Sequence, residues 1–154
     1  MDLTDADRII LGMLQSSARE RLENIAFEAG ISLATVQRRI RALKEHGFIE
    51  KDVSLLSPPA MGFKMTFVIL IELERERLDQ LDAFKRKIRA EPQVQQCYYI
   101  TGDADFALIA LARDMDDYQE LTHRLFFDDS NVKRFRTSVV MDRSKVCLDV
   151  PVDV

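Results

Sequence analysis

The sequence predicts an α+β protein with two domains of different architecture. Before position 50 the apolar residues recur at helical spacing, whereas after position 65 strand-like and helix-like segments alternate. Between these regions, residues 57–62 read Ser-Pro-Pro-Ala-Met-Gly, and the two prolines lack a backbone donor and fix an extended geometry. A chain of 154 residues can form one substantial core or two small ones.

Two helices are expected at the start of the chain. Thr4 and Asp7 have the spacing of a capping box, and apolar residues within 9–14 mark one face of a first helix. After a polar turn, Leu22 and Ile25 belong to the apolar stripe of a second helix. These stripes can pack on each other and on a third helix.

The third helix is predicted by its boundaries as well as by its stripe. Gly30 can end the preceding helix in a left-handed conformation, and Ser32 can cap the next one by accepting a hydrogen bond from the amide of Thr35. Gly47 ends this helix. The residues with the spacing of a buried stripe are Val36, Ile40 and Leu43.

The outer face of this third helix is basic. Ser32 to Lys44 contains four basic residues and no acidic one, although the whole chain has a formal charge of −4. Arginine can pair with guanine, glutamine with adenine, and threonine can touch a thymine methyl group, so the face suits the major groove of double-stranded DNA. A solvated surface is the alternative. We expect base-facing side chains at Thr35, Gln37, Arg38 and Arg41, and positioning contacts from Ser32, Arg39 and Lys44.

Residues 48–56 alternate imperfectly, which predicts either a short two-stranded wing or an extended exit strand. We therefore expect a winged helix-turn-helix domain over 1–52, a linker over 53–65, and a second domain over 66–154.

The second domain is predicted to be ferredoxin-like, with the order βαββαβ. Strands are expected over 66–73, 94–101, 106–112 and 134–141, and helical spacing lies between the first and second and between the third and fourth. In this arrangement two helices cover one face of an antiparallel sheet. The other face stays bare, which predicts self-association, most simply as a twofold homodimer.

Thr101-Gly102-Asp103-Ala104-Asp105 joins two of the predicted strands. Read alone it is a plain β-turn, because glycine tolerates positive φ and aspartate favours turns. As a ligand loop, its carboxylates could hold an ammonium group while the backbone amides near Gly102 receive a carboxylate. A catalytic use of Asp103 and Asp105, with Asp142 or His123, is poorly supported, since no nucleophile–base pair accompanies them. We expect no enzyme.

Composition narrows the class of protein. A hydrophobic content of 47% with 31% charged residues is ordinary for a soluble globular protein. No apolar run approaches the roughly 20 residues that span a bilayer, and the acidic start is unlike a secretory signal, so we expect a cytoplasmic protein without a membrane contact. Cys97 and Cys147 lack metal-site spacing and are expected to be buried or partly buried reduced thiols. Neither a metal nor a cofactor is expected.

These features together resemble the Lrp/AsnC transcription regulators. The resemblance covers nearly the whole chain, and its most specific parts are Ser32 to Ile49 and the segment Gly102-Asp103-Ala104-Asp105-Phe106. It implies a DNA-binding dimer that assembles further, and a small-molecule effector, commonly an amino acid, bound near the Gly-Asp-x-Asp loop. The implied effector-binding residues are Thr101, Gly102, Asp103 and Asp105.

The sequence therefore predicts a sequence-specific DNA-binding transcriptional regulator whose activity or assembly is modulated by a small molecule. The alternative is an amino-acid sensor or oligomerisation module whose helical domain contacts protein instead of DNA. Salt distinguishes the two, because phosphate contacts release counterions and an apolar protein contact does not.

Overall fold

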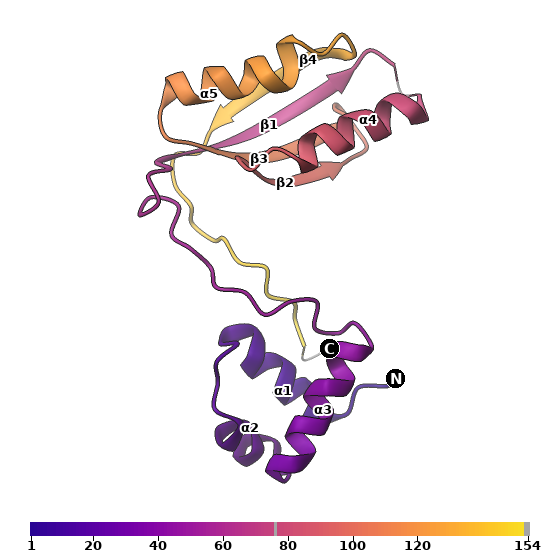
Figure 1. The fold of residues 1–154 in the computed structure, drawn as a ribbon, viewed down its shortest axis with the longest axis vertical. Coiled ribbons are helices and arrows are strands. Elements are labelled where there is room, and N and C mark those ends of the chain that lie inside the picture. The colour runs from indigo at the N-terminus through magenta and orange to yellow at the C-terminus, as the bar shows by residue number, and fades with distance from the viewer. Residues whose placement is uncertain (76, 153–154) are drawn as a thin grey trace. The chain divides into compact units, whose positions relative to one another are not determined.

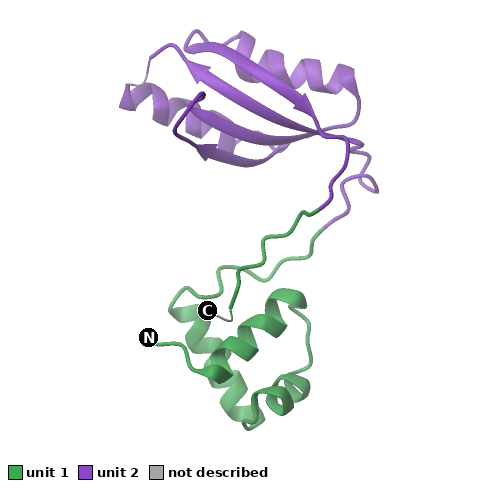
Figure 2. Cartoon of the chain, turned by 180° about the vertical axis from the view of Figure 1, so that it is seen from behind, with its two compact units in different colours: residues 1–55, 145–154 green, residues 56–144 purple. Residues whose placement is uncertain are grey.

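The computed structural model describes residues 1–75 and 77–152. The chain forms two compact units, one made of Met1–Leu55 with Lys145–Val154 and the other of Leu56–Ser144 (Figure 2). The sequence pattern predicts a second domain over 66–154. Residues 145–152 instead join the first unit, while residues 76, 153 and 154 of the predicted second domain lie outside the described residues.

The first unit contains three helices around one small core (Figure 1). Its four fully buried apolar side chains come from all three helices, because each apolar stripe faces the other two: Ile10, Ile25, Val36 and Leu43. The helices are α1 (Asp5–Ser16), α2 (Leu22–Ala29) and α3 (Leu33–Glu45).

The predicted helix boundaries are confirmed. At the start of α1, Thr4 and Asp7 form both hydrogen bonds of a capping box. Gly30 adopts the left-handed conformation with φ 63°, and the Oγ of Ser32 accepts a hydrogen bond from the amide of Thr35 at 3.3 Å. These local contacts fix the turn between α2 and α3.

The two-stranded wing is not present in the part of the chain that the structure describes. Residues 49–57 leave α3 as an extended segment but form neither a strand nor a hairpin, so both the wing and a regular exit strand are absent from this stretch. A tight hairpin turn favours glycine, asparagine or aspartate at positive φ, and this stretch offers only Asp52. Asp52 is instead paired with Lys44 of α3 at 2.5 Å.

The second unit is the predicted βαββαβ domain. Its antiparallel sheet has the order β2-β3-β1-β4, and both helices, α4 and α5, cover the same face (Figure 1). A short π-helical segment, His123–Phe127, continues α5. The elements are β1 (Met65–Leu73), α4 (Leu78–Arg89), β2 (Val94–Tyr99), β3 (Phe106–Ala112), α5 (Met115–Thr122) and β4 (Val132–Val139).

Alternation along β1 separates a core face from an open face. Phe67, Ile69 and Ile71 are fully buried under the helices, whereas Val68 and Leu70 point to the other side and are partly exposed. The core is completed by apolar residues of β3 and both helices. Two helices therefore leave one side of this sheet uncovered, as the sequence pattern predicted.

Both cysteines are free. Cys97 is half-buried, as predicted, but the expectation is wrong for Cys147, which is exposed because it lies in an extended segment outside both cores. Over residues 1–75 and 77–152, no helix is long and apolar enough to cross a membrane. Within the same ranges, no three His, Cys, Asp or Glu side chains are grouped as a metal site.

Candidate nucleic-acid interface and ligand pocket

The outer face of α3 presents exposed side chains at intervals of three and four residues: Ala34, Gln37, Arg38 and Arg41. The buried Val36 and Leu43 hold the opposite face against α1 and α2. Among the described residues, Gln37, Arg38 and Arg41 have no polar side-chain partner. These three side chains are therefore available to a ligand that approaches α3.

The other residues predicted to contact DNA, unlike these three, have partners inside the protein. Ser32 caps the start of α3 by accepting from the amide of Thr35, and the hydroxyl oxygens of the two residues are 2.9 Å apart. Arg39 Nη1 lies 3.5 Å from Oδ2 of the buried Asp7, and Lys44 is paired with Asp52. Sequence reasoning did not include Ala34, although its helical spacing to Gln37 and Arg38 places it on the same face.

The loop between β2 and β3 is held in place by Asp105. The Oδ2 of Asp105 accepts a hydrogen bond from the amide of Leu73 at 2.6 Å. Its own amide donates to the carbonyl of Ile71, and its carbonyl accepts from the amide of Ile100, both at 2.8 Å. Asp105 thus ties the loop to β1, while Gly102 turns the chain with φ 117°.

A pocket of about 410 Å³ lies beside this loop. Its walls come from the loop, from the end of β1 and from β4: Glu72, Leu73, Gly102, Asp103, Ala104, Asp105, Arg134 and Arg136. Thr101, His123 and Asp142 do not line it. The pocket therefore brings together three of the four predicted effector residues and none of the additional groups of the catalytic alternative.

Charges of both signs face this pocket. Arg134 donates to Oε1 of Glu72 from Nε at 2.8 Å and from Nη2 at 2.6 Å. This hydrogen bond from Arg134 holds the pKa of Glu72 below its ordinary value, and the same contact raises the pKa of Arg134. Asp103 and Arg136 are exposed and have no polar side-chain partner among the described residues.

Sequence reasoning did not assign Glu72, Arg134 or Arg136 to the pocket. Strand alternation puts Arg134 and Arg136 on one face, and that signal was readable. The sequence does not show which strand lies beside them, because only the antiparallel register of β1 and β4 sets Arg134 opposite Glu72.

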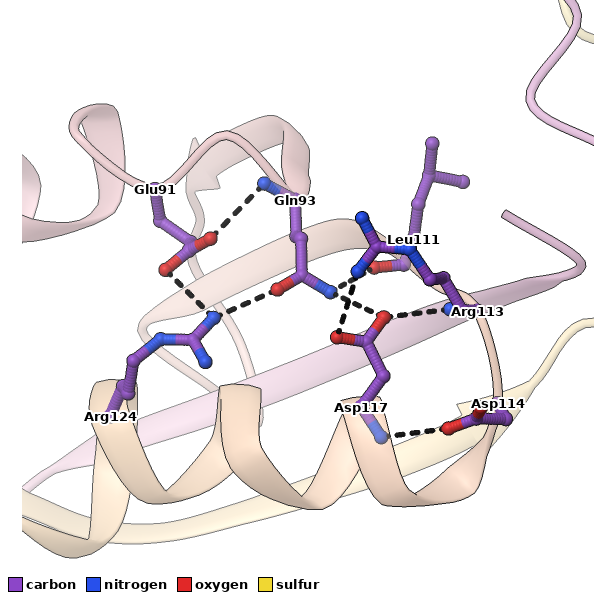
Figure 3. Close-up of polar contacts among 7 residues, drawn as sticks. All are labelled: Glu91, Gln93, Leu111, Arg113, Asp114, Asp117 and Arg124. Carbon is purple, nitrogen blue, oxygen red and sulfur yellow. Dashed lines mark hydrogen bonds and ion pairs between the residues drawn. The ribbon is translucent and has the colours of Figure 1, made fainter. Parts of the chain in front are cut away.

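A polar network around the buried Gln93 lies at the other end of β3. The side-chain amide of Gln93 donates to the carbonyl of Leu111 and to Asp117, and its oxygen accepts from Arg124 at 2.8 Å (Figure 3). Asp117 also accepts from the amide of Arg113 at 2.8 Å. These groups satisfy one another and fix the start of α5 on the sheet, so the network is structural.

A helix-turn-helix unit with a free basic face, joined to a separate sheet unit with a charged pocket, defines a ligand-responsive DNA-binding protein. Known proteins agree with this class. The Lrp/AsnC ligand binding domain matches residues 66–147, and the IclR helix-turn-helix domain matches residues 10–53. The chain belongs to the Lrp/AsnC family and is a DNA-binding transcriptional regulator.

Three similar proteins illustrate the relationship. An uncharacterized HTH-type transcriptional regulator of Sinorhizobium fredii is 44% identical, over 100% of this chain and 91% of its own. The leucine-responsive regulatory protein of Escherichia coli is 29% identical, over 94% and 88%. The fold is similar to that of a Neisseria meningitidis transcriptional regulator solved with L-methionine, with a TM-score of 0.93, 24% identity and coverage of 99% and 98%.

Proposed function

We propose that the outer face of α3 reads DNA sequence and that an amino acid bound beside the loop 101–105 modulates this activity. The observation that carries the proposal is the pairing pattern of charged side chains. Arg38 and Arg41 on α3, and Asp103 and Arg136 at the pocket, lack partners among the described residues. An exposed charge without an internal partner is free for a ligand.

On DNA, Gln37, Arg38 and Arg41 make the base contacts, and the small side chain of Ala34 permits close approach of the helix to the groove floor. Ser32 and Thr35 lie at the helix N-terminus, where hydroxyls and amides reach phosphates. Arg39 acts by holding α3 on α1. Lys44 contacts a phosphate of the DNA backbone, and this contact competes with its exposed ion pair to Asp52.

At the pocket, a free carboxylate and a free guanidinium match the two charges of an amino acid. Asp103 holds the α-ammonium group, while Arg136 and the amide of Gly102 receive the α-carboxylate. Asp105 supports the loop, and Thr101 contacts a ligand only if the loop moves, since it does not line the pocket. The methionine complex and the name of the leucine-responsive relative favour this ligand class.

The open face of the sheet supports self-association. Val68, Leu70 and Ile109 are partly exposed on it. A twofold homodimer buries such a face against its own copy, and higher assembly extends it. The role of the protein is regulatory and not catalytic, like that of the relatives named as transcriptional regulators, and we place it in the cytoplasm.

Fluorescence anisotropy with the DNA upstream of the chain's own gene tests the proposal, against a scrambled duplex and across a salt series. Specific binding that weakens steeply with salt is expected, because phosphate contacts release counterions. Binding that is absent at low salt, or equal for both duplexes, contradicts DNA reading and favours a sensor whose helical unit contacts protein.

The pocket is tested separately by calorimetry with individual amino acids. Asp103→Asn and Arg136→Gln are expected to abolish the heat of binding, whereas Arg86→Gln on the exposed side of α4 serves as the matched control. Unchanged binding in both pocket variants places the ligand elsewhere.

A further inference from the structure

The carboxyl-terminal segment of the chain lies along α1, within the first unit. The side-chain amide of Gln15 makes two hydrogen bonds to the backbone of Val150, donating to its carbonyl and accepting from its amide, each at 3.1 Å. Nη1 of Arg8 donates to the carbonyl of Val152 at 2.9 Å. The Gln15 side chain thus satisfies both backbone polar groups of Val150, as the backbone of a neighbouring strand would do.

Gly12 lies between these two contacts on α1. A Cβ at this position would be 3.4 Å from Cγ2 of Val152, so any longer side chain would meet the segment. Glycine in a helix interior costs about 1 kcal/mol relative to alanine. Alanine would meet Val152 at an ordinary van der Waals distance, so the segment excludes only larger side chains from position 12.

The segment also closes one wall of an apolar cavity of about 530 Å³ in this unit. Leu11 and Leu14 of α1 and the exit residue Phe48 form the facing walls. Every second residue of the segment is apolar, at Val146, Leu148, Val150 and Val152, so these side chains share one side of an extended peptide.

The segment is held mainly by its backbone. Leu148 is 76% exposed and Val150 66% exposed although both line the cavity. A peptide bound in this way can detach without unfolding the three-helix core, which consists of residues of α1, α2 and α3. The polar contacts of its described residues are to Arg8 and Gln15 of α1, so the outer face of α3 stays free.

We propose that the groove along α1 is a peptide-binding site for this chain's own segment 148–152, and that docking ties the DNA-binding unit to the sheet unit a second time. The units are already joined at residues 55 and 56, and the docked segment adds the crossing at 144 and 145. A unit held by two chain segments has less freedom to reorient than one held by a single linker. The effect on DNA rests on the proposed function.

Docking is measured with a nitroxide on Cys147 in a Cys97→Ser background, so that only the segment is labelled. An immobilised spectrum is expected for this protein. Gln15→Ala removes both bonds to Val150 and should shift the balance toward the mobile form about tenfold. Gln119→Ala, at an exposed glutamine of α5, should leave the spectrum unchanged.

Gly12→Leu gives the same answer without weakening α1, because leucine is a better helix former than glycine. The leucine side chain occupies the space that Val152 fills, so the nitroxide on Cys147 should become mobile while the helical circular dichroism signal is retained. A mobile label before any substitution, or an immobile one in both variants, overturns the docking proposal.

The second tether is tested by ending the chain after Lys145. Affinity for a duplex with two half-sites should fall about threefold to tenfold, because each DNA-binding unit of a dimer is then held by one chain segment and reorients more freely, while affinity for one half-site is retained. An unchanged two-site affinity overturns the tether. Failure of the full chain to bind any duplex instead contradicts the proposed function, and the nitroxide result stands independently.

Discussion

Arg39 of α3 forms an ion pair with Asp7 of α1, whose side chain is fully buried. The distance from Nη1 to Oδ2 is 3.5 Å, and the same carboxylate oxygen accepts from the amide and the hydroxyl of Thr4 at 2.9 and 2.6 Å. One buried carboxylate therefore caps α1 and anchors α3. This contact sets how α3 is held on the rest of its unit.

Arg39→Met should lower the free energy of unfolding by about 1–3 kcal/mol, because the buried carboxylate of Asp7 loses its cation. Arg38→Met, one position earlier and without an internal partner among the described residues, should leave stability within about 0.5 kcal/mol of the parent. Urea denaturation measures both. Equal stabilities would show that the ion pair contributes nothing.

The same two variants should separate by their effect on DNA. Arg38→Met should weaken specific binding by about 1–3 kcal/mol and relax the preference at one base pair. Arg39→Met should preserve the salt slope of log Kd, since a residue that holds α3 on α1 does not neutralise a phosphate. A slope reduced by about one unit in Arg39→Met would instead identify a phosphate contact.

Asp105→Ala should destabilise the sheet unit by about 1–2 kcal/mol, because the amide of Leu73 loses its acceptor. Asp103→Ala is the matched control in the same loop, and thermal unfolding should be unchanged for it. If Asp103→Ala were the more destabilising of the two, the division between support and ligand contact would be reversed.

The contact between Glu72 and Arg134 predicts a titration at low pH. The folded pKa of Glu72 is lowered, so its contribution to stability is fully present above the ordinary pKa and is lost as pH falls through the lowered folded value. In Arg134→Gln the pKa of Glu72 should rise, and in Arg136→Gln it should rise less, because Arg136 acts only through a weaker coulombic interaction. Carbon-13 NMR of the glutamate carboxyl measures this, and equal shifts in the two variants would disprove the ranking.

The two thiols should react at different rates. Burial raises the pKa of the half-buried Cys97, whereas Cys147 is exposed, and the thiolate is the reactive form. A disulfide reagent at pH 8 should therefore give a fast phase and a slow phase, and Cys97→Ser should remove the slow one. Loss of the fast phase in that variant would contradict the assignment.

Much of this protein is readable from local sequence. Capping by Ser32, the left-handed Gly30 and the apolar stripe of α3 depend on residues close together in the chain, and each is found as predicted. The uncovered side of the sheet likewise follows from the predicted βαββαβ order, because two helices cover only one face.

Tertiary structure decided which of the predicted side chains are free. The sequence itself determined the fold class, the basic outer face of α3 and the Gly-Asp-x-Asp loop, since each follows from local periodicity or turn chemistry. Only the folded chain pairs Arg39 with Asp7, Asp105 with Leu73 and Gln15 with Val150. These partners lie 32, 32 and 135 positions apart, and contacts at such separations depend on how whole elements pack and on no local pattern.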